Sequence, residues 1–520
     1  GMPVIGLKAF PAALVGGLDS LVGALIGSLI VAAQTVWSSG IGASVGLALG
    51  VGLGLSRSFN AYVFPLFKAI SQVPVIGWLP LLMLLVGIDE ALKFLLIAKA
   101  ALVPMIKDLA LKARAADIHF TIDAEEAERL ELSLDIIEAL VADDELFAGG
   151  WQGFGMALQA YSKRAVPLVD WVVGLARRHG RRIMVRLVKG AYWDSEVKLS
   201  QVGGHVDYPV FTRKVATDVS YLACAAKLLA APDAIYPAFA THNAYTIGAI
   251  KALAGEAEFE FQRLHGMGED VYAELAKFEA ASGNRRTPVR IYAPVGGHKE
   301  LLAYLVRRLL ENGANSSFVN RMADAEVPVD DLVGDPVAEL AALNPRRNPA
   351  IPLPRDIFPG RRNSAGIDLA DPLLRQPLLE HLAELASLRW EAEPTTVAGA
   401  AEPAQEIRSA QDNSRIVGTI RNASAADVAF AAERAAQAQP GWNALGGAER
   451  AALLDKAADA FEAHTPEFLS LCQREAGKTL GDAVLELREA VDFLRYYAAE
   501  ARRLFTPGDE ALPGPTGEAN

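Results

Sequence analysis

The sequence predicts an α/β protein built around an incomplete (β/α)8 barrel, with about six of the eight strand–helix units. Two observations support this fold. The first 88 residues hold only four charged side chains, Lys8, Asp19, Arg57 and Lys68, whereas charges recur every few residues from Lys107 onward. After residue 112, short apolar strands alternate with amphipathic helices, which is typical of a parallel sheet. We therefore expect a hydrophobic, transmembrane-like helical leader followed by a charged, enzyme-like body.

The composition excludes several classes of function. The chain has 520 residues and a net charge of −12, with +2 in the first 88 residues and −14 in the remainder. An acidic protein is a poor ligand for a phosphate backbone, so no nucleic acid partner is expected. Cys224 and Cys472 lie far apart, which favours a reducing cytoplasm over a disulfide framework. The histidines form no HExxH motif and no CxxC is present, so no metal site is predicted.

The leader contains apolar segments at residues 21–37, 41–55, 73–87 and 94–106. The first two approach the length of a membrane-spanning helix. Glycines recur at every fourth position in the second segment, the spacing that lets membrane helices pack closely, at Gly42, Gly46, Gly50 and Gly54. The two basic residues after it would place the next loop on the cytoplasmic side. If the leader inserts, the lipid bilayer becomes a partner.

Two pieces of the leader resemble ABC-transporter permeases. Residues 10–33 (FPAALVGGLDSLVGALIGSLIVAA) look like a branched-chain amino-acid permease. Residues 40–105, which include AISQVPVIGWLPLLMLLVGIDEALKFLLIA, are similar to nitrate, sulfonate and taurine permeases. These resemblances make a permease-type membrane protein one alternative function. The loop that couples such permeases to their ATPase is not recognisable, so an inactive fusion of permease pieces with an enzyme is another alternative.

The body is predicted to hold strands at residues 118–122, 155–160, 183–188, 238–241, 259–264 and 289–293. Helices are predicted between them, including residues 124–141, 166–178, 212–229 and 299–312. A closed barrel needs eight units, so we expect two to be absent from the N-terminal side. Barrel enzymes keep their chemistry at the C-terminal strand ends. Polar residues occupy those positions here, namely Asp123, Gln159, Arg186, Lys189, His242, Asn243, Gln262, His265 and Tyr292. An ordinary hydrogen bond explains any one of them, but six consecutive strand ends indicate an active site.

Four stretches of the body are distinctive, namely RIMVRLVKGAYWDSEVK (182–198), ATHNAY (240–245), EFQRLHGMGE (260–269) and RIYAPVGGHKELLAYLVRRLLENGANSSFVNR (290–321). They closely resemble the proline dehydrogenase barrel of the proline utilization A family, whose members are bifunctional flavoenzymes that oxidise proline to glutamate. The resemblance runs from about residue 111 to the C-terminus. It implies FAD-dependent oxidation of L-proline to pyrroline-5-carboxylate, with a membrane quinone as electron acceptor. It also implies a cytoplasmic enzyme portion associated with the bacterial inner membrane.

The resemblance assigns roles to individual residues. A small carboxylate substrate suits a planar cationic clamp, which Arg307 and Arg308 would supply, with Glu311 one turn away. An isolated Arg/Glu helix face would otherwise be a solvated surface. The proline pocket would further include Asp123, Tyr292 and Tyr304. The residues expected to contact FAD are Gln159, Arg186, Lys189, Gly190, Ala191, Tyr192, Trp193, His242 and Asn243. The family's lysine on an early barrel strand has no counterpart here, which puts the activity of this chain in question.

The C-terminal third is predicted to be a linker followed by the start of an aldehyde dehydrogenase domain. Residues 344–363 (NPRRNPAIPLPRDIFPGRRN) are typical of a connecting segment, and the chain resembles the aldehyde dehydrogenase from Arg415. Gly477-Lys478-Thr479 is not a P-loop, because Cys472 stands where that motif needs glycine. The sequence stops at Asn520, before any segment resembling the NAD-binding sheet, so the second, NAD-dependent activity is expected to be absent. The expected domains are residues 1–107, 111–325, 326–400 and 401–520.

Overall fold

The fold of the chain is seen in a computed structural model that describes residues 91–283, 285–297, 301–302, 306, 334–396, 398 and 402–505, with backbone alone for residues 91–101. These residues belong to one unit, residues 89–520. The predicted helix at 299–312 and the site residues Tyr304, Arg307, Arg308 and Glu311 lie largely or wholly outside the described part.

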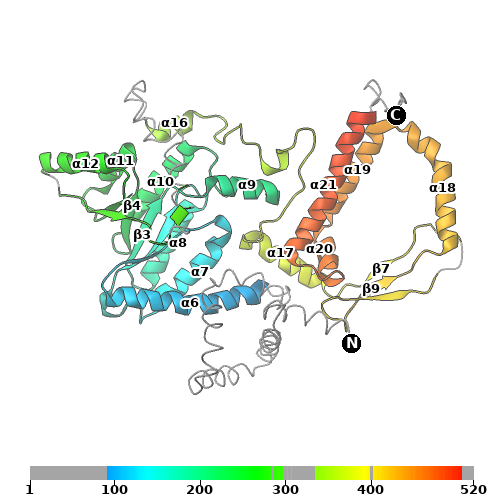
Figure 1. Cartoon of the computed structure of the whole chain (residues 1–520), viewed down its shortest axis with the longest axis horizontal. Helices are drawn as coiled ribbons and strands as arrows, with labels where there is room; N and C mark the ends of the chain where they lie inside the picture. Colours follow the sequence, from blue (N-terminus) through cyan, green and yellow to red (C-terminus); the bar gives the residue numbers. More distant parts are fainter. Residues whose placement is uncertain are drawn as a thin grey trace, which may run out of the picture. The chain divides into compact units, whose positions relative to one another are not determined.

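A six-stranded sheet forms the centre of the first half, with strands in sequence order and every neighbouring pair parallel (Figure 1). Its strands are β1 (Phe120–Ile122), β2 (Phe154–Gln159), β3 (Ile183–Val188), β4 (Ile235–Ala240), β5 (Glu260–Leu264) and β6 (Val289–Tyr292). The predicted α/β fold with six parallel strands is confirmed, and β3 has the predicted bounds; the helix predicted after the sixth strand lies outside the described residues. The register aligns Arg186 with Ala157 on one side and Ala238 on the other.

Helices pack on one face of this sheet. They are α6 (Ala91–Ala115), α7 (Leu130–Val141), α8 (Ala165–Arg178), α10 (Lys214–Leu229), α11 (Ala244–Ala254) and α12 (Glu269–Ala281), with short 3-10 turns at Ala127–Arg129 and Ala148–Gly150. Helix α9 (Trp193–Gly203) follows β3 and packs instead with Tyr161, Tyr208 and Val210. Alternate strand residues such as Leu158, Leu187 and Phe239 join buried helix residues such as Val172 and Tyr221 in one core. Because strand side chains alternate between faces, the intervening residues face the concave side of the sheet.

The apolar run at residues 94–106, predicted as part of a transmembrane-like leader, belongs to α6. In the described side chains of this run, Leu102, Val103 and Ile106 pack against the barrel core, and Ala110 follows them fully buried. Among the described residues, no helix combines the length and the apolar character needed to cross a membrane. The run is therefore corrected to a barrel helix, and the predicted boundary at 107–111 falls inside it. The other three apolar segments lie outside the described residues.

The second half holds a small three-stranded sheet and a group of helices. The strand order is β7 (Trp390–Ala392), β9 (Ile416–Ile420), β8 (Gln405–Arg408). The helices are α16 (Pro336–Ala342), α17 (Pro372–Leu385), α18 (Ala425–Ala444), α19 (Gly446–Ala463), α20 (Thr465–Arg474) and α21 (Leu480–Phe505), with a 3-10 turn at Pro354–Asp356. Ser424 and Asp427 form a capping box that starts α18 directly after β9, as the predicted strand–helix pair requires. Cys472 lies in α20, the amphipathic helix expected there.

Candidate functional site

The concave face of the sheet combines small and polar side chains. Gly155 and Ala157 on β2, and Ala238 and Ala240 on β4, alternate with residues of the helix-packed core. Arg186 lies between these two strands on β3. Small residues on both sides of a cationic side chain leave room for a flat ligand over the middle of the sheet.

Three of the predicted site residues come together across the sheet. Arg186 on β3 donates a hydrogen bond to Asp123, which follows β1. The Arg186 guanidinium also lies 5.7 Å from the centre of the Tyr292 ring, at the end of β6. Residues from the first, third and sixth strands therefore meet around one cation, as expected for a site at the C-terminal strand ends.

The segment after β3 is tied to the segment after β1 by hydrogen bonds. Gln159 accepts from the Ala191 amide at 3.2 Å and donates to the Glu125 carbonyl at 2.7 Å. Tyr192 donates its hydroxyl proton to the Glu125 carboxylate at 2.6 Å. Sequence reasoning named Gln159, Ala191 and Tyr192 but missed Glu125. The available signal was its place two residues after the strand-end Asp123.

Gly190 has a backbone conformation that only glycine adopts readily, with φ +142°. A Cβ at this position would lie 2.4 Å from the ring of Tyr161, which is itself buried. The chain therefore passes close to Tyr161 in the segment of residues 190–193, which borders the site and is called its lip below.

Lys189 and Trp193 flank that glycine and are held by other elements. Lys189 contacts Asp218 of α10, and burial lowers the pKa of the Lys189 ammonium against the opposing effect of Asp218. Asp218 is shared with Lys214 at 3.0 Å. Trp193 donates its indole N–H to the Phe211 carbonyl at 2.8 Å. Both flanking side chains therefore have protein partners that fix the segment.

His242 and Asn243 connect the fourth unit to the fifth. The Nε2 atom of His242 accepts from the Leu264 amide at 3.2 Å, and Asn243 caps α11 by accepting from the Thr246 amide at 2.9 Å. The contact of His242 with Leu264 joins the C-terminal end of β4 to the C-terminal end of β5, at the strand ends where the other predicted site residues lie.

A buried carboxylate that sequence reasoning did not assign lies on the same face. Glu260 of β5 accepts from Arg290 of β6 through both oxygens at 2.8 Å, and from Gln262 at 2.8 Å. Its pKa would be raised by burial, but these hydrogen bonds outweigh burial and hold it below the ordinary value. Burial, together with nearby Glu260, raises the pKa of the Tyr236 hydroxyl to about 12. The polar interior of the sheet thus extends from the Asp123–Arg186 pair to its last strand.

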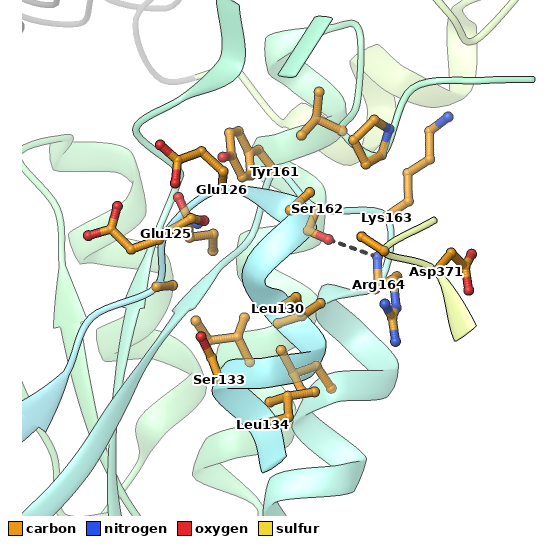
Figure 2. A pocket seen from close by; sticks show the side chains of 18 of the residues that line it. Glu125, Glu126, Leu130, Ser133, Leu134, Tyr161, Ser162, Lys163, Arg164 and Asp371 are labelled. Atoms are coloured by element: carbon orange, nitrogen blue, oxygen red, sulfur yellow. Dashed lines mark hydrogen bonds between the residues drawn. The ribbon is translucent and has the colours of Figure 1, made fainter. Parts of the chain in front are cut away.

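A cavity of about 290 Å³ opens beside the first two strands (Figure 2). Asp123 and Gln159 line it together with Leu130 and Leu134 of α7. Figure 2 shows Glu125, Glu126 and Tyr161 at one end, and Lys163, Arg164 and Asp371 at the other. The cavity therefore has apolar side chains in its middle and charged side chains at both ends, and two of the predicted site residues line it. In the part of the chain that the structure describes, no group of three His, Cys, Asp or Glu side chains could hold a metal ion.

Two family models match the sequence. The model described as proline dehydrogenase matches residues 38–321, and the model described as aldehyde dehydrogenase family matches residues 397–518. The first match begins inside the apolar leader, well ahead of residue 111.

Curated relatives and solved structures show the same likeness. The chain is 50% identical over 413 residues to the bifunctional protein PutA of Klebsiella aerogenes, covering 77% of this chain and 31% of that protein. It is 49% identical over 429 residues to PutA of Escherichia coli (strain K12), covering 80% and 32%. A crystal structure of a bifunctional proline utilization A protein superposes with TM-score 0.69 at 48% identity, covering 81% of this chain and 40% of that one. The chain therefore spans about a third of the length of the curated relatives it matches.

Proposed function

Because the chain belongs to the proline dehydrogenase family and resembles its bifunctional proline utilization A members over most of its described length, we propose that its barrel oxidises L-proline to pyrroline-5-carboxylate with FAD. The observation that carries this proposal is the meeting of Asp123, Arg186 and Tyr292 at three strand ends. That arrangement sets a cation and two polar side chains around the space above a sheet lined by small residues.

The residues present fit a large planar cofactor with anionic groups. The concave face has short side chains that leave space above the sheet, at Gly155, Ala157, Ala238 and Ala240. At position 190, a side chain larger than that of glycine would collide with Tyr161. Cationic donors for an anionic group are supplied by Arg186 and Lys189, the latter fixed by Asp218. FAD bound here would supply the acceptor for the hydride that leaves the carbon beside the proline nitrogen.

The chain's own residues would bind and orient the substrate. Arg186 would place a positive charge beside bound FAD, where reduction develops negative charge, and such a preorganised charge lowers the activation barrier of the oxidation. Asp123 fixes the Arg186 guanidinium, and Tyr292 bounds the same space. Arg307, Arg308 and Glu311 are proposed to hold the proline carboxylate, with Tyr304 beside it. The membrane quinone acceptor and the inner-membrane association stay predictions.

Neither alternative from the leader gains support. The family models and relatives support an enzyme, and the described helices include none that could cross a membrane.

The test is proline-dependent dye reduction by the full chain after purification with FAD. We expect a yellow protein that reduces the dye with proline, and a loss of about a hundredfold in kcat/KM for Asp123→Asn, which removes the anchor of Arg186. Asp144→Asn is the matched control, because Asp144 is 97% exposed and pairs with Arg181, a residue outside the predicted site. A folded protein that takes up no FAD, or that carries FAD but leaves the dye unreduced, would contradict the proposal and favour an inactive fusion.

A further inference from the structure

Helix α9 joins the proposed cofactor lip to the second half of the chain. It begins at Trp193, directly after the Gly190–Tyr192 segment, and ends at Gly203. Gly204 follows in the left-handed conformation with φ +62°. The last carbonyls of a helix have no partner within the helix, so they need donors from elsewhere.

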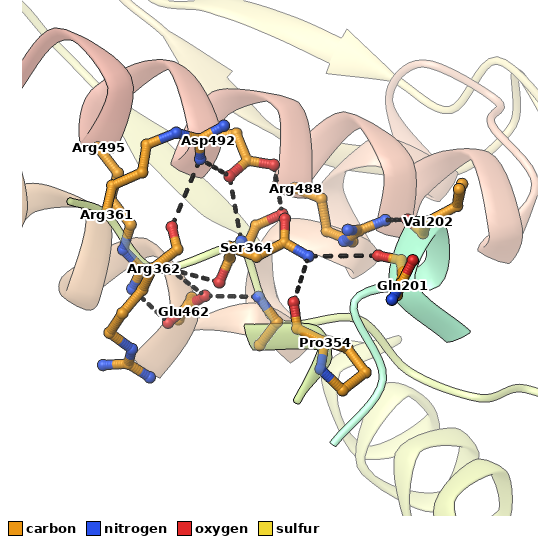
Figure 3. Close-up of polar contacts among 12 residues, drawn as sticks. Gln201, Val202, Pro354, Arg361, Arg362, Ser364, Glu462, Arg488, Asp492 and Arg495 are labelled. Atoms are coloured by element: carbon orange, nitrogen blue, oxygen red, sulfur yellow. Dashed lines mark hydrogen bonds and ion pairs between the residues drawn. The ribbon is translucent and has the colours of Figure 1, made fainter. Parts of the chain in front are cut away.

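Donors for the end of α9 come from residues far along the sequence (Figure 3). Arg488 of α21 donates to the Val202 carbonyl at 2.7 Å. Asn363 donates to the Gln201 carbonyl at 3.3 Å, and the Gly366 amide donates to the Gly204 carbonyl at 2.9 Å. The connecting segment and α21 thus cap a helix of the barrel.

This cap is buried and tightly packed. Arg488 is 8% exposed and Asn363 is 4% exposed. A Cβ on Gly366 would lie 1.7 Å from the Gly203 carbonyl oxygen, so the connecting segment lies directly against the helix end. A charge-assisted hydrogen bond in such a place is stronger than one at the surface.

The support on the far side of the cap is rigid as well. Arg495, one turn beyond Asp492 on α21, binds Glu462 at 2.7 Å and Asp459 at 2.9 Å. Asp492 accepts from Arg361 at 2.7 Å and from the connecting segment's Ser364 hydroxyl at 2.7 Å. Figure 3 shows these contacts grouped along one side of α21. Arg488 is therefore held on a helix that is itself fixed by ion pairs, including those of the buried Arg495.

The beginning of α9 transmits this position to the lip. Glu196, 4% exposed in the first turn, accepts from the Ala127 amide at 2.7 Å, and Tyr192 binds Glu125. Both partners belong to the segment that follows β1. Helix α9 is therefore held at its beginning by the segment after β1 and at its end by Arg488 and the connecting segment.

We propose that Arg488 is a positioning residue of the barrel site, which sets the place of the Gly190–Trp193 segment through helix α9. This inference rests on the proposed function only where it assigns that segment to FAD. The second half of the chain would then change how tightly the first half binds FAD, although Arg488 itself contacts helix α9 and not the cofactor.

The experiment compares the full-length parent with Arg488→Gln, Arg488→Lys and Asn363→Ala. Arg503→Gln is the matched control, because Arg503 lies exposed on the same helix and pairs locally with Glu500. Hydrogen exchange of the peptide covering residues 186–198 is measured without added flavin. FAD affinity and the visible flavin spectrum are measured separately.

In Arg488→Gln we expect about tenfold faster exchange in residues 190–193 and about tenfold weaker FAD binding, with a shifted flavin spectrum. Arg488→Lys keeps a cationic donor and should recover part of both effects. Asn363→Ala should show the same pattern more weakly, which keeps the test available if Arg488→Gln does not fold. Arg503→Gln should match the parent.

Unchanged exchange in residues 190–193 of folded Arg488→Gln would overturn the inference, as would faster exchange with unaltered FAD affinity in a flavin-binding parent. A parent that binds no FAD would contradict the proposed function instead. The exchange measurement alone then decides whether Arg488 positions the segment.

Discussion

Arg290 on the last strand of the barrel sheet donates two hydrogen bonds of 2.8 Å to the buried carboxylate of Glu260 on its neighbour. Among the described strands β6 lies at the edge of the sheet, and its other face leaves Val289 and Ile291 exposed. Bidentate geometry fixes both partners more firmly than a single bond would. The Arg290 side chain is 46% exposed, whereas the Glu260 side chain is 3% exposed. If the pair were broken, water could solvate Arg290, but the Glu260 carboxylate would stay buried without its cation.

Replacing Arg290 by Gln should lower the free energy of unfolding by about 2 kcal/mol, because Glu260 keeps its charge while losing its cation. Urea unfolding at pH 7 measures the change. Arg178→Gln is the control, since that residue pairs with Glu138 at the surface and should cost less than about 0.5 kcal/mol. Equal losses in the two variants would show that the edge pair contributes no more than a surface pair.

Acid should destabilise the barrel through its paired carboxylates. Burial would raise the pKa of Glu260 and of Glu279, but hydrogen bonds from Arg290 and Lys251, respectively, hold both pKa values below the ordinary 4.5. A carboxyl with a depressed folded pKa contributes stability above its unfolded pKa and loses that contribution as pH falls through the folded pKa. Urea midpoints should therefore fall below about pH 4.5, and Glu260→Gln should flatten that fall. A slope unchanged in the variant would contradict the assignment.

Glu196 should show the opposite dependence on pH. Burial raises the pKa of this carboxyl, against the hydrogen bond that it accepts from the Ala127 amide. A carboxyl with a raised folded pKa contributes stability below its unfolded pKa and loses it as pH rises through the folded value. Glu196→Gln keeps an acceptor oxygen without the charge. Its urea midpoint should exceed that of the parent at pH 7 and match it near pH 4, and a lower midpoint at both would refute this account.

The strands could be predicted because their chemistry is local. Most of the strands are short apolar runs followed by small or polar residues, and in β3 the run is interrupted only by Arg186, which faces the concave side. The strand-end residues Asp123, Arg186 and Tyr292 then had to converge, because parallel strands end at one edge of the sheet. Topology therefore predicted the edge of the sheet at which these residues lie, although it did not single out these three among the nine strand-end residues.

Hydropathy could not identify the environment of the apolar run in α6. A helix buried against a barrel core and a helix in lipid both present Leu, Val and Ile, and the apolar run of α6 at residues 94–106 is interrupted by a single charge, Lys99. The distinction depends on what covers the helix, here α7 and the sheet. Arg488 and Val202 illustrate the same limit, because 286 residues separate the two ends of their hydrogen bond.

Gly190 offers a direct test of the lip of the site. Alanine at this position meets two costs, since φ +142° is a conformation that side chains with a Cβ rarely adopt and the added atom would lie 2.4 Å from the Tyr161 ring. Tyr161 cannot easily withdraw, because it is 5% exposed and packs with Tyr208 and Val210. We expect Gly190→Ala to lower the free energy of unfolding by about 2 kcal/mol.

The same substitution should weaken FAD binding by at least about tenfold, because relief of the clash moves the segment that the cofactor is proposed to contact. Gly180→Ala is the control that separates the effect of backbone strain from the effect of a clash at the lip. Gly180 also has a positive φ of +61°, yet nothing lies within 4 Å of its added Cβ, and it follows α8. It should cost about 1 kcal/mol of stability and leave FAD affinity unchanged. Flavin titration and urea unfolding of both variants measure the two effects. If Gly190→Ala loses stability but binds FAD as the parent does, the lip does not contact the cofactor.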